Sequence, residues 1–267
     1  MRPYIEQLKN VFKQEITYRA DSLLNMISGI LFLLVQIYIW RALMGATGQV
    51  STSAGVIDTR DMATYVVISS VISVLLSTTI FEIIDDRIRT GQIAMDILKP
   101  VNFQALMFST TIGTVLRRSF SELLPVLLIG IIFFHIKFPS LENFLFFLIA
   151  VSCSVLINFF ITYGIALFAF WYPAPSWHWS RLYRDLMRFL SGSLIPLWFF
   201  PSILVQLSQF LPFKHIFFTT ISIYLGRVDR GEIVLILLQQ IFWIVSLYGL
   251  AELIWRQGIR KLVIQGG

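Results

Sequence analysis

Long apolar runs, separated by short polar segments, set the organisation of this chain. The most regular runs cover residues 22–43, 62–84, 144–171 and 233–255. A helix needs about 20 consecutive apolar residues to cross the hydrocarbon core of a bilayer. Each of these four runs is therefore predicted to be a transmembrane helix.

A further span is predicted around residues 119–138, third in chain order, directly after Arg117 and Arg118. We expect the two arginines to lie near the cytoplasmic interface, where basic side chains are common. The alternative is a longer helix that begins at Phe103. In that helix Arg118 and Glu122 would form a buried pair, because residues four apart face each other.

The fifth span is predicted over residues 189–211, which contain Gly192, Pro196 and Pro201. Proline removes an amide donor and blocks the preceding helical turn, so this span should be kinked or split. The apolar piece at residues 216–225 is too short to cross a bilayer at 1.5 Å per residue. We expect it to form a short external re-entrant helix within residues 212–232.

The chain begins with an amphipathic pattern. Apolar side chains recur every three or four positions over residues 4–16, with Lys9 and Lys13 between them. Residues 1–20 are predicted to form a helix on the cytoplasmic membrane surface or, alternatively, an ordinary helix packed on the rest of the protein. No apolar core precedes a small-residue cleavage site, so we expect no removed signal peptide.

The polar connections complete the topology. Residues 44–60 are rich in Gly, Ser and Thr, which predicts a flexible connection rather than a packed element. Charged residues gather over residues 85–101, which must lie in water or at the interface, because a charge at the bilayer centre costs about 3 kcal/mol. Placing both termini in the cytoplasm puts most of the 21 lysine and arginine residues on that side, as the positive-inside rule requires.

Composition supports a single membrane domain over residues 1–267. The chain is 57% hydrophobic and 13% charged, with a mean hydropathy of +0.77, whereas soluble domains contain about 25% charged residues. The predicted fold class is an all-α integral membrane protein with about six transmembrane helices. The net charge of +6 does not indicate nucleic-acid binding, because no basic run with interleaved aromatic residues lies outside the spans.

Motifs of enzymes and metal sites are absent from the sequence. There is no G-x-x-x-x-G-K-[ST] phosphate loop and no G-x-S-x-G nucleophile elbow. His135, His178 and His215 fall in separate segments, and the single Cys153 can form neither an intrachain disulfide nor a thiolate cluster. We therefore expect no catalytic residues, no metal site and no cofactor in this chain.

A few polar residues within the spans are candidates for a translocation path. Ser69, Ser73 and Ser77 are spaced by four and share one side of a helix. This pattern favours close helix packing, and a stripe that lines a substrate path is the alternative. Asn158 and the helix-breaking Pro196 complete the candidate path.

The other polar groups of the spans give little support to a coupling-ion site. Ion-coupled transporters place acids deep in the membrane, but the acids of these spans lie near span ends, where they reach water. They are Glu82, Glu122, Glu232 and Glu252. The deeper amides, such as Gln240, are expected to form hydrogen bonds between helices.

Two segments carry a resemblance to a known family. Residues 89–100 read R-T-G-Q-I-A-M-D-I-L-K-P, and residues 192–201 read G-S-L-I-P-L-W-F-F-P before L-P-F at residues 211–213. Together with the amphipathic start, they resemble the permease subunits of ABC-2 type ABC transporters, in the bacterial exporter branch. The resemblance covers nearly the whole chain, although Gln92 and Lys99 stand where acidic and arginine residues are common in that family.

The resemblance implies a mechanism as well as a fold. In that family two permeases pair, and the segment after the second span docks into a separate ATP-binding cassette ATPase, which binds the ATP and Mg²⁺. The protein would then be a multi-pass exporter subunit of the bacterial inner (plasma) membrane, in contact with lipid and with a second, identical or related, permease. The residues that would form or shape the coupling segment are Arg87, Arg89, Gly91, Asp96, Lys99 and Pro100.

Two other classes of function remain open from the sequence. An ion-coupled secondary transporter of a small amphipathic substrate would stop when a proton or sodium gradient collapses while ATP remains. An intramembrane enzyme or assembly factor would act on a lipid as a single chain. Co-purification with an ATPase distinguishes the ABC permease from both.

Overall fold

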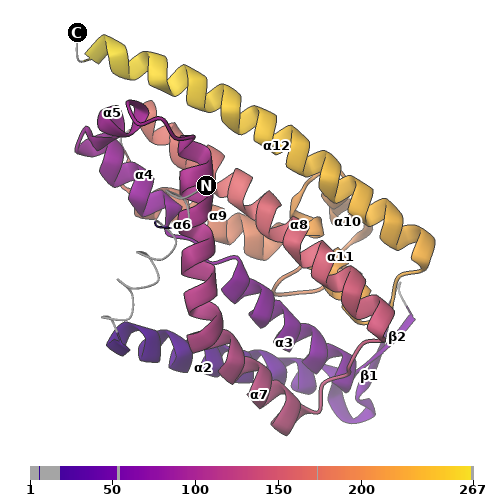
Figure 1. The fold of residues 1–267 in the computed structure, drawn as a ribbon. Helices are drawn as coiled ribbons and strands as arrows, with labels where there is room; N and C mark the ends of the chain where they lie inside the picture. Colours follow the sequence, from indigo (N-terminus) through magenta and orange to yellow (C-terminus); the bar gives the residue numbers. More distant parts are fainter. Residues whose placement is uncertain (1–5, 7–18, 53–54, 173, 266–267) are drawn as a thin grey trace.

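The computed structural model describes residues 6, 19–52, 55–172 and 174–265, and it is mainly helical (Figure 1). Except for Glu6, the helix predicted over residues 4–16 lies outside the described residues. The elements are α2 (Arg19–Met44), β1 (Gln49–Thr52), β2 (Gly55–Asp58), α3 (Thr59–Leu75), α4 (Ile80–Arg89), α5 (Gln92–Ile97), α6 (Phe103–Arg118), α7 (Leu124–Phe134), α8 (Leu141–Ala166), α9 (Ser176–Leu190), α10 (Ser202–Gln209), α11 (Phe218–Tyr224) and α12 (Arg230–Gln265).

Helix α3 joins two apolar cores because both of its faces are apolar. Tyr65 and Ile72 belong to one core, which also takes side chains from α4, α6, α8, α9, α11 and α12. Val67 and Val71 belong to a second core, formed with α2, α7 and β2. A helix that is apolar on all sides is stable in a protein only when it is buried, so the rest of the fold is arranged around α3.

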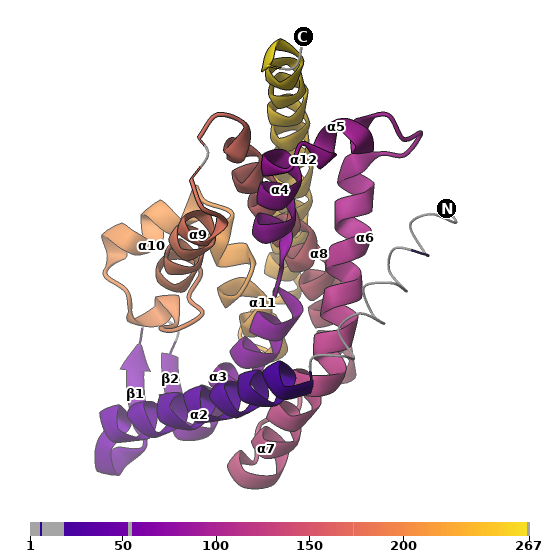
Figure 2. The same ribbon diagram turned by 90° about the vertical axis from the view of Figure 1, so that its left-hand side faces the viewer.

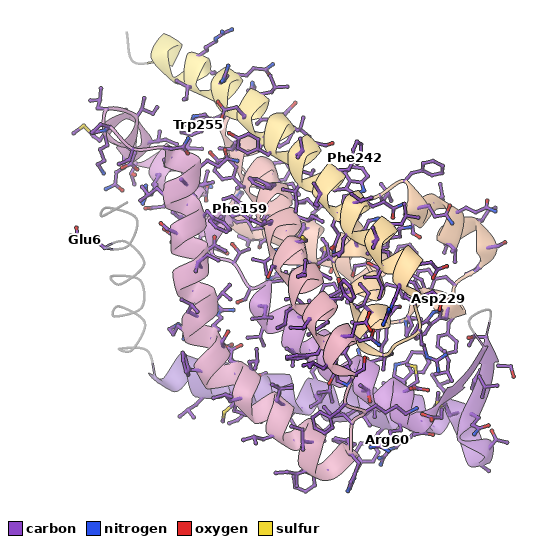
Figure 3. All side chains as sticks on the ribbon, turned by 45° about the vertical axis from the view of Figure 1, so that its right-hand side comes forward. Glu6, Arg60, Phe159, Asp229, Phe242 and Trp255 are labelled. Carbon is purple, nitrogen blue, oxygen red and sulfur yellow. The ribbon has the colours of Figure 1, made fainter. Side chains whose placement is uncertain are left out.

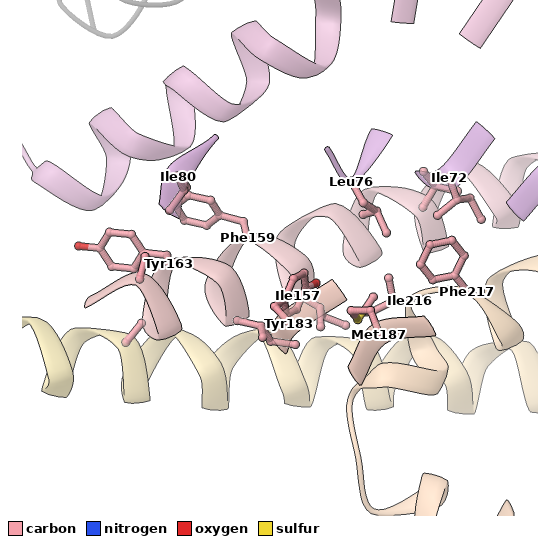
Figure 4. Close-up of a cluster of buried hydrophobic side chains, with 14 of the residues drawn as sticks. Ile72, Leu76, Ile80, Ile157, Phe159, Tyr163, Tyr183, Met187, Ile216 and Phe217 are labelled. Carbon is pink, nitrogen blue, oxygen red and sulfur yellow. The ribbon is translucent and has the colours of Figure 1, made fainter. Parts of the chain in front are cut away.

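Aromatic side chains fill the first core (Figure 4). Phe159 of α8 contacts Tyr163, with ring centroids 5.7 Å apart, and Phe108 of α6 at 5.0 Å. Phe103 at the start of α6 stacks on Trp255 of α12, with centroids 4.5 Å apart. Such pairs contribute about 0.5–1.5 kcal/mol each beyond their buried area, and they hold α6, α8 and α12 together.

A buried amide also joins α12 to its neighbours. The side chain of Gln240 donates to the carbonyl oxygen of His215 at 2.8 Å and to that of Ala150 at 3.2 Å. Nearby, the hydroxyls of Ser154 and Thr220 lie 3.1 Å apart. The expected helix-to-helix hydrogen bond is confirmed for Gln240, and it fixes the position of α11 between α8 and α12.

In the described part of the chain, four helical segments are long and apolar enough to cross a membrane. They are Leu23–Thr47, Thr59–Arg89, Leu141–Phe170 and Arg230–Lys261, and they correspond to the four most regular apolar runs of the sequence. The first and last of them bury only a small share of their side chains within the chain. Figure 3 shows Phe242, which is exposed, on the outer side of α12. Large apolar faces are rarely left exposed to water, so we expect lipid or a partner protein to cover them.

The connection at residues 44–60 is not the flexible loop that its composition predicts. After a 3-10 turn at Gly45–Thr47, β1 and β2 pair antiparallel, with Val50 opposite Ile57. Ile57 is fully buried in the second core. The prediction was wrong because glycines at positive φ shape the turn and the hairpin here, and the valine and isoleucine side chains alternate across the strands.

The helix around Arg118 begins earlier than the preferred prediction of residue 119. It begins at Phe103 and continues through a π-helical turn at Ser119–Leu123 into α7, which ends at Phe134. The structure thus agrees with the alternative of a long helix that carries Arg118 and Glu122 near its middle. Asn102 starts this helix early, because its side-chain oxygen accepts the backbone N–H of Ala105 at 2.9 Å.

The region after α9 is split, as its glycine and prolines predict. Helix α9 ends at Leu190, Gly192 has a φ of 79°, and the next regular helix, α10, begins after Pro201. The short apolar piece forms the seven-residue helix α11, which is buried. No continuous helix covers residues 189–211 in the described structure.

Candidate coupling segment and translocation cavity

The helical segment that contains α3 and α4 is interrupted at residues 76–79. Ser77, the last of the three serines predicted to line a path, lies in this interruption. Ser77 lies beyond α3, and its hydroxyl donates to the carbonyl oxygen of Val74 at 2.7 Å. The hydroxyl oxygen of Thr78 accepts the backbone N–H of Ile80 at 3.2 Å. Serine and threonine hydroxyls compete for backbone groups in this way, and the sequence Ser77-Thr78-Thr79 therefore stops the helix.

Asn158 satisfies a backbone group that the interruption leaves free. Its side-chain N–H donates to the carbonyl oxygen of Leu76 at 3.1 Å, and its side-chain oxygen accepts the hydroxyl of Tyr183. All three groups are buried. Asn158 on α8 thus connects the interruption in the α3–α4 segment to α9, and Figure 4 shows Leu76 and Tyr183 in the same cluster.

Two neighbouring cavities adjoin this interruption. One of about 290 Å³ lies between α2, α3 and α7, and one of about 310 Å³ lies between α4, α8 and α9. They share five lining residues, which form the boundary between them. These are Ser73, Ser77, Arg118, Arg188 and Ser193.

The structure brings four of the five predicted path residues to these cavities. Ser69, Ser73 and Ser77 line the first cavity, and Asn158 lines the second. The hydroxyl of Ser69 also donates to the carbonyl oxygen of Ser193 at 2.8 Å, so this serine packs α3 against the segment after α9. The packing interpretation is confirmed for Ser69, and the stripe as part of a substrate path stays a prediction.

Pro196 is buried and lines neither cavity, so its place on a translocation path stays a prediction. The segment before it packs tightly on α3, where the hydroxyl of Tyr65 donates to the carbonyl oxygen of Gly192 at 2.7 Å. A Cβ atom at Gly192 would lie 3.0 Å from Cβ of Phe218. The segment after α9 is therefore closely packed at Gly192.

Arg118 and Glu122 face each other across the π-helical turn. Nε of Arg118 lies 4.0 Å from Oε1 of Glu122, which is too long for a hydrogen bond. Both atoms are buried, and neither makes a hydrogen bond to any residue that the structure describes. A π-helical turn inside a helix is often found at a functional site, and here it places an unsatisfied ion pair beside the cavities.

The predicted coupling residues form a compact unit at the end of α4. Asp96 is buried, and its carboxylate forms ion pairs with a guanidinium nitrogen of Arg87 at 2.5 Å and with Nζ of Lys99 at 2.6 Å. Arg89 pairs with Asp85 at 2.8 Å. Gly91 has a φ of 70° and forms the turn between α4 and α5, a conformation that glycine adopts without steric cost.

Not every predicted coupling residue takes part in these contacts. Pro100 is exposed and follows the last turn of the segment. Arg87 also lies over the ring of Phe103, with 5.8 Å from the guanidinium carbon to the ring centroid. The buried Ile93 packs in the first core. The segment is therefore attached to the rest of the fold by Ile88 and Ile93, by this cation–π contact, and by the backbone N–H of Ser176, which donates to the carboxylate of Asp85 at 3.3 Å.

The outward face of the segment is apolar. Met95 is 63% exposed and Leu98 is 79% exposed, and Ile97 is exposed beside them. Large apolar side chains beside a group of charged residues are typical of a surface that another protein covers.

A second charged group lies at the other end of the molecule and was missed by the sequence reasoning. This hairpin-end cluster consists of Asp58, Asp61, Lys137 and Arg227. Asp61 is buried, and its carboxylate forms ion pairs with Nζ of Lys137 at 2.8 Å and with a guanidinium nitrogen of Arg227 at 2.7 Å. Asp58 also forms an ion pair with Nζ of Lys137, at 2.8 Å. The only signal in the sequence was the D-x-x-D spacing before an apolar run, which is a helix-capping pattern.

The hairpin-end cluster changes the titration of its members. Partial burial raises the pKa of Asp58, but the hydrogen bonds from Lys137 and from the backbone of Asp61 outweigh it, so the pKa lies below its usual value. Burial lowers the pKa of Lys137, but the two aspartates outweigh it, so that pKa lies above its usual value. In the described part of the chain, no three His, Cys, Asp or Glu side chains are arranged to hold a metal ion.

The long apolar helices, the polar cavities among them and the compact charged segment at one end together define a membrane transport protein. The comparison with protein families agrees with this class. A family model described as an ABC-2 family transporter protein matches residues 55–266. The chain therefore belongs to the ABC-2 transporter family and is an ABC transporter permease, a membrane protein. Neither the curated proteins nor the solved structures that were compared include a match.

Proposed function

We propose that this chain is the membrane-spanning subunit of an exporter that separate ATP-binding cassette ATPase subunits drive. The observation that supports the ATPase contact best is the exposed apolar face of α5 on a segment that its own ion pairs hold together. The ATPase would bind ATP and Mg²⁺ and would dock on Met95 and Leu98. The charges of residues 85–101 would surround this contact.

Helix α4 gives the proposed docking surface a direct connection to the cavities. It spans ten residues between the interruption at residues 76–79 and Gly91, which corresponds to about 15 Å along the helix axis. Phe81 and Glu82 in its first turn line the second cavity. A push on α5 would therefore move α4 as a rigid rod and open or close the space beside Ser77.

The interruption at residues 76–79 would serve as the hinge for this movement. Side chains take part in its hydrogen bonds: Ser77 and Asn158 donate to backbone carbonyls, and Thr78 accepts the backbone N–H of Ile80. ATP-driven closure of the ATPase pair would favour one arrangement of the hinge over another. Transport then follows from the different affinities of the two arrangements for substrate.

The wider assembly follows from the family resemblance. We propose about six membrane crossings, with α6–α7 and the region from α9 to α10 supplying the two that are not long apolar helices. Both termini and α5 would lie in the cytoplasm of a bacterial cell, with α11 on the external side of the inner membrane. Two permeases, of identical or related chains, would pair.

The test replaces the apolar docking face and measures coupling. Purified permease and its ATPase are reconstituted in lipid vesicles, and ATP hydrolysis and transport are recorded for the double variant Met95→Ser, Leu98→Ser. We expect the ATPase to dissociate and transport to be lost. The control is Phe138→Ser, because Phe138 is 70% exposed but lies at the opposite end of the molecule.

Two results would contradict the proposal. One is a double variant that binds its ATPase and transports as well as the Phe138→Ser protein does. The other is transport that stops when proton and sodium gradients are collapsed while ATP remains present. The second result would support an ion-coupled carrier in place of an ATP-driven one.

A further inference from the structure

The boundary between the two cavities is positively charged. Arg118 at the end of α6 and Arg188 near the end of α9 line both cavities, and Arg184 lines the second. The acidic residues among the lining side chains are Glu122 and Glu82, one for each cavity. Two separate helices thus bring arginines to one space that opens to the surface: Arg118 is partly buried, and Arg184 and Arg188 are exposed.

These arginines are available for a ligand. Nε of Arg118 makes no hydrogen bond and lies 4.0 Å from Glu122. Neither Arg184 nor Arg188 makes a hydrogen bond or ion pair with another residue of the described chain. A guanidinium group with free N–H donors binds oxyanions in a two-pronged geometry, so this boundary has the chemistry of an anion site.

The serines at the same place cannot supply the donors in this arrangement. The hydroxyl of Ser73 donates to the carbonyl oxygen of Ser69 at 2.8 Å, and that of Ser77 donates to Val74. A hydroxyl has only one hydrogen to donate. The positive charge of the boundary therefore rests on the arginines.

The first cavity continues from this charged boundary to an apolar wall. Met26 and Phe32 of α2, Val66 of α3 and Val126 of α7 line it. Phe32 is also 50% exposed on the outer surface of α2, beside other exposed apolar side chains of that helix. The apolar wall thus reaches the surface that would face lipid.

We infer that these cavities bind an amphiphile that carries one anionic oxyacid group, with the anion between Arg118 and Arg188 and the apolar part along α2. The inference rests on the proposed transport function for the role of the ligand. The first cavity has room for about ten water molecules at roughly 30 Å³ each. That space suits a head group, and the tail would extend along α2 toward the bilayer.

The test is a binding measurement on the purified permease alone. Isothermal titration calorimetry in mild detergent compares dihexanoyl phosphatidic acid with dihexanoyl phosphatidylcholine and with sodium phosphate. We expect the anionic amphiphile to bind at least tenfold more tightly than either of the others. Equal affinity for phosphatidylcholine would overturn the charge requirement, and equal affinity for inorganic phosphate would overturn the amphiphile requirement.

A matched pair of variants locates the site. Arg188→Gln removes one guanidinium group from the boundary, and it should weaken binding of phosphatidic acid about tenfold, the usual size of one charge-assisted hydrogen bond. Arg181→Gln is the control, because Arg181 lies on the same helix and is exposed as Arg188 is, but lines neither cavity. Identical affinities of these two variants would overturn the proposed site.

Arg118 is tested with two substitutions, because its removal leaves Glu122 unpaired. Arg118→Lys keeps the positive charge and should keep most of the affinity for phosphatidic acid, whereas Arg118→Gln should lose it. Loss in both variants, with normal thermal stability of the protein, would contradict a charge-based site.

The binding measurement uses no ATPase, so its outcome is separate from that of the coupling test. If the Met95→Ser, Leu98→Ser protein transports normally, the proposed function fails although anion binding can still be observed. If the anionic amphiphile does not bind while that double variant loses transport, only the inferred substrate class fails.

Discussion

Two buried aspartates at opposite ends of the molecule each form ion pairs with two basic side chains, but they connect different parts of the chain. Asp61 lies by the hairpin and is 6% exposed, and Asp96 lies in α5 and is 4% exposed. Figures 1 and 2 show the hairpin and α5 at opposite ends in both views. Similar chemistry thus stands at the two ends of the fold.

The difference lies in where the cations come from. Lys137 and Arg227 are 76 and 166 residues from Asp61 along the chain, so the hairpin-end cluster joins three distant segments. Arg87 and Lys99 are nine and three residues from Asp96. The ion pairs of Asp96 therefore lie within the coupling segment, and Asp85, Ile88 and Ile93 connect that segment to the rest of the fold.

The largest expected effect is that of Asp61→Asn. This change leaves Lys137 and Arg227 without their shared charge, and removing one member of a buried ion pair costs about 3 kcal/mol of unfolding free energy. The thermal midpoint in mild detergent should fall accordingly. Amide hydrogen exchange should become faster in all three segments that the cluster joins: at β2, at residues 135–137 and at the start of α12.

The matched control for that variant is Glu142→Gln. Glu142 pairs with Arg230 at 2.6 Å at the same end of the molecule, but both side chains are largely exposed. Exposed pairs contribute about 0–1 kcal/mol, so this variant should be near wild type. If Asp61→Asn is no less stable than Glu142→Gln, the hairpin-end cluster does not tie the segments together.

The next effect is that of Asp96→Asn, with a smaller cost of about 1–2 kcal/mol, because Lys99 is largely exposed and can turn to water. The increase in hydrogen exchange should be confined to residues 85–101. The transport rate should fall strongly although the thermal midpoint falls only a little. A loss that spreads to the hairpin would contradict the idea of a self-contained segment.

Gly91→Ala should have a third, smaller effect. A Cβ atom at Gly91 meets nothing within 4 Å, so only the positive φ opposes alanine, at about 1–2 kcal/mol. The matched control is Gly91→Asn, since asparagine tolerates this conformation better. Thermal midpoints of the two variants should differ, with the asparagine protein closer to wild type, and equal midpoints would show that the turn can rearrange.

The smallest expected effect is that of pH on the hairpin-end cluster. The pKa of Asp58 is lowered, so its contribution is present above its unfolded pKa of about 4 and is lost as pH falls through the lower folded pKa. The pKa of Lys137 is raised, so its contribution is present below about 10.4 and is lost as pH rises through the higher folded pKa.

These two shifts predict a constant contribution between about pH 5 and pH 9. The difference in thermal midpoint between wild type and Lys137→Met should be flat over that interval and should shrink above pH 10.5. A difference that changes between pH 6 and pH 8 would mean that a group outside the pair governs the cluster.

Several parts of the fold could be predicted because their signals are local. The four apolar runs gave the four long helices, and the prolines at 196 and 201 gave the split after α9. The coupling segment was predicted as a unit, and its ion pairs join residues that are near neighbours in the chain. The hairpin was missed, because a glycine-rich composition does not distinguish a tight turn between strands from a flexible loop.

The start of α6 shows how tertiary contacts override a local rule. Arg117 and Arg118 predicted an interface in the middle of what is one long helical stretch. In the folded protein Glu122 lies one turn beyond Arg118, and Arg118 lines the two cavities, and hydropathy alone shows neither contact. A charge inside an apolar segment is costly only when nothing polar lies beside it.

The sequence by itself determined that this protein is a bundle of apolar helices with a charged, self-paired segment between two of them, because hydropathy and short spacings are written along the chain. The tertiary structure alone decided that Asp61 meets Lys137 and Arg227, that Asn158 supports the interruption at residues 76–79, and that Arg118 and Arg188 share a cavity. These contacts depend on how distant helices pack together. The residues lie far apart in the chain, so no local spacing or hydropathy pattern predicts that they meet.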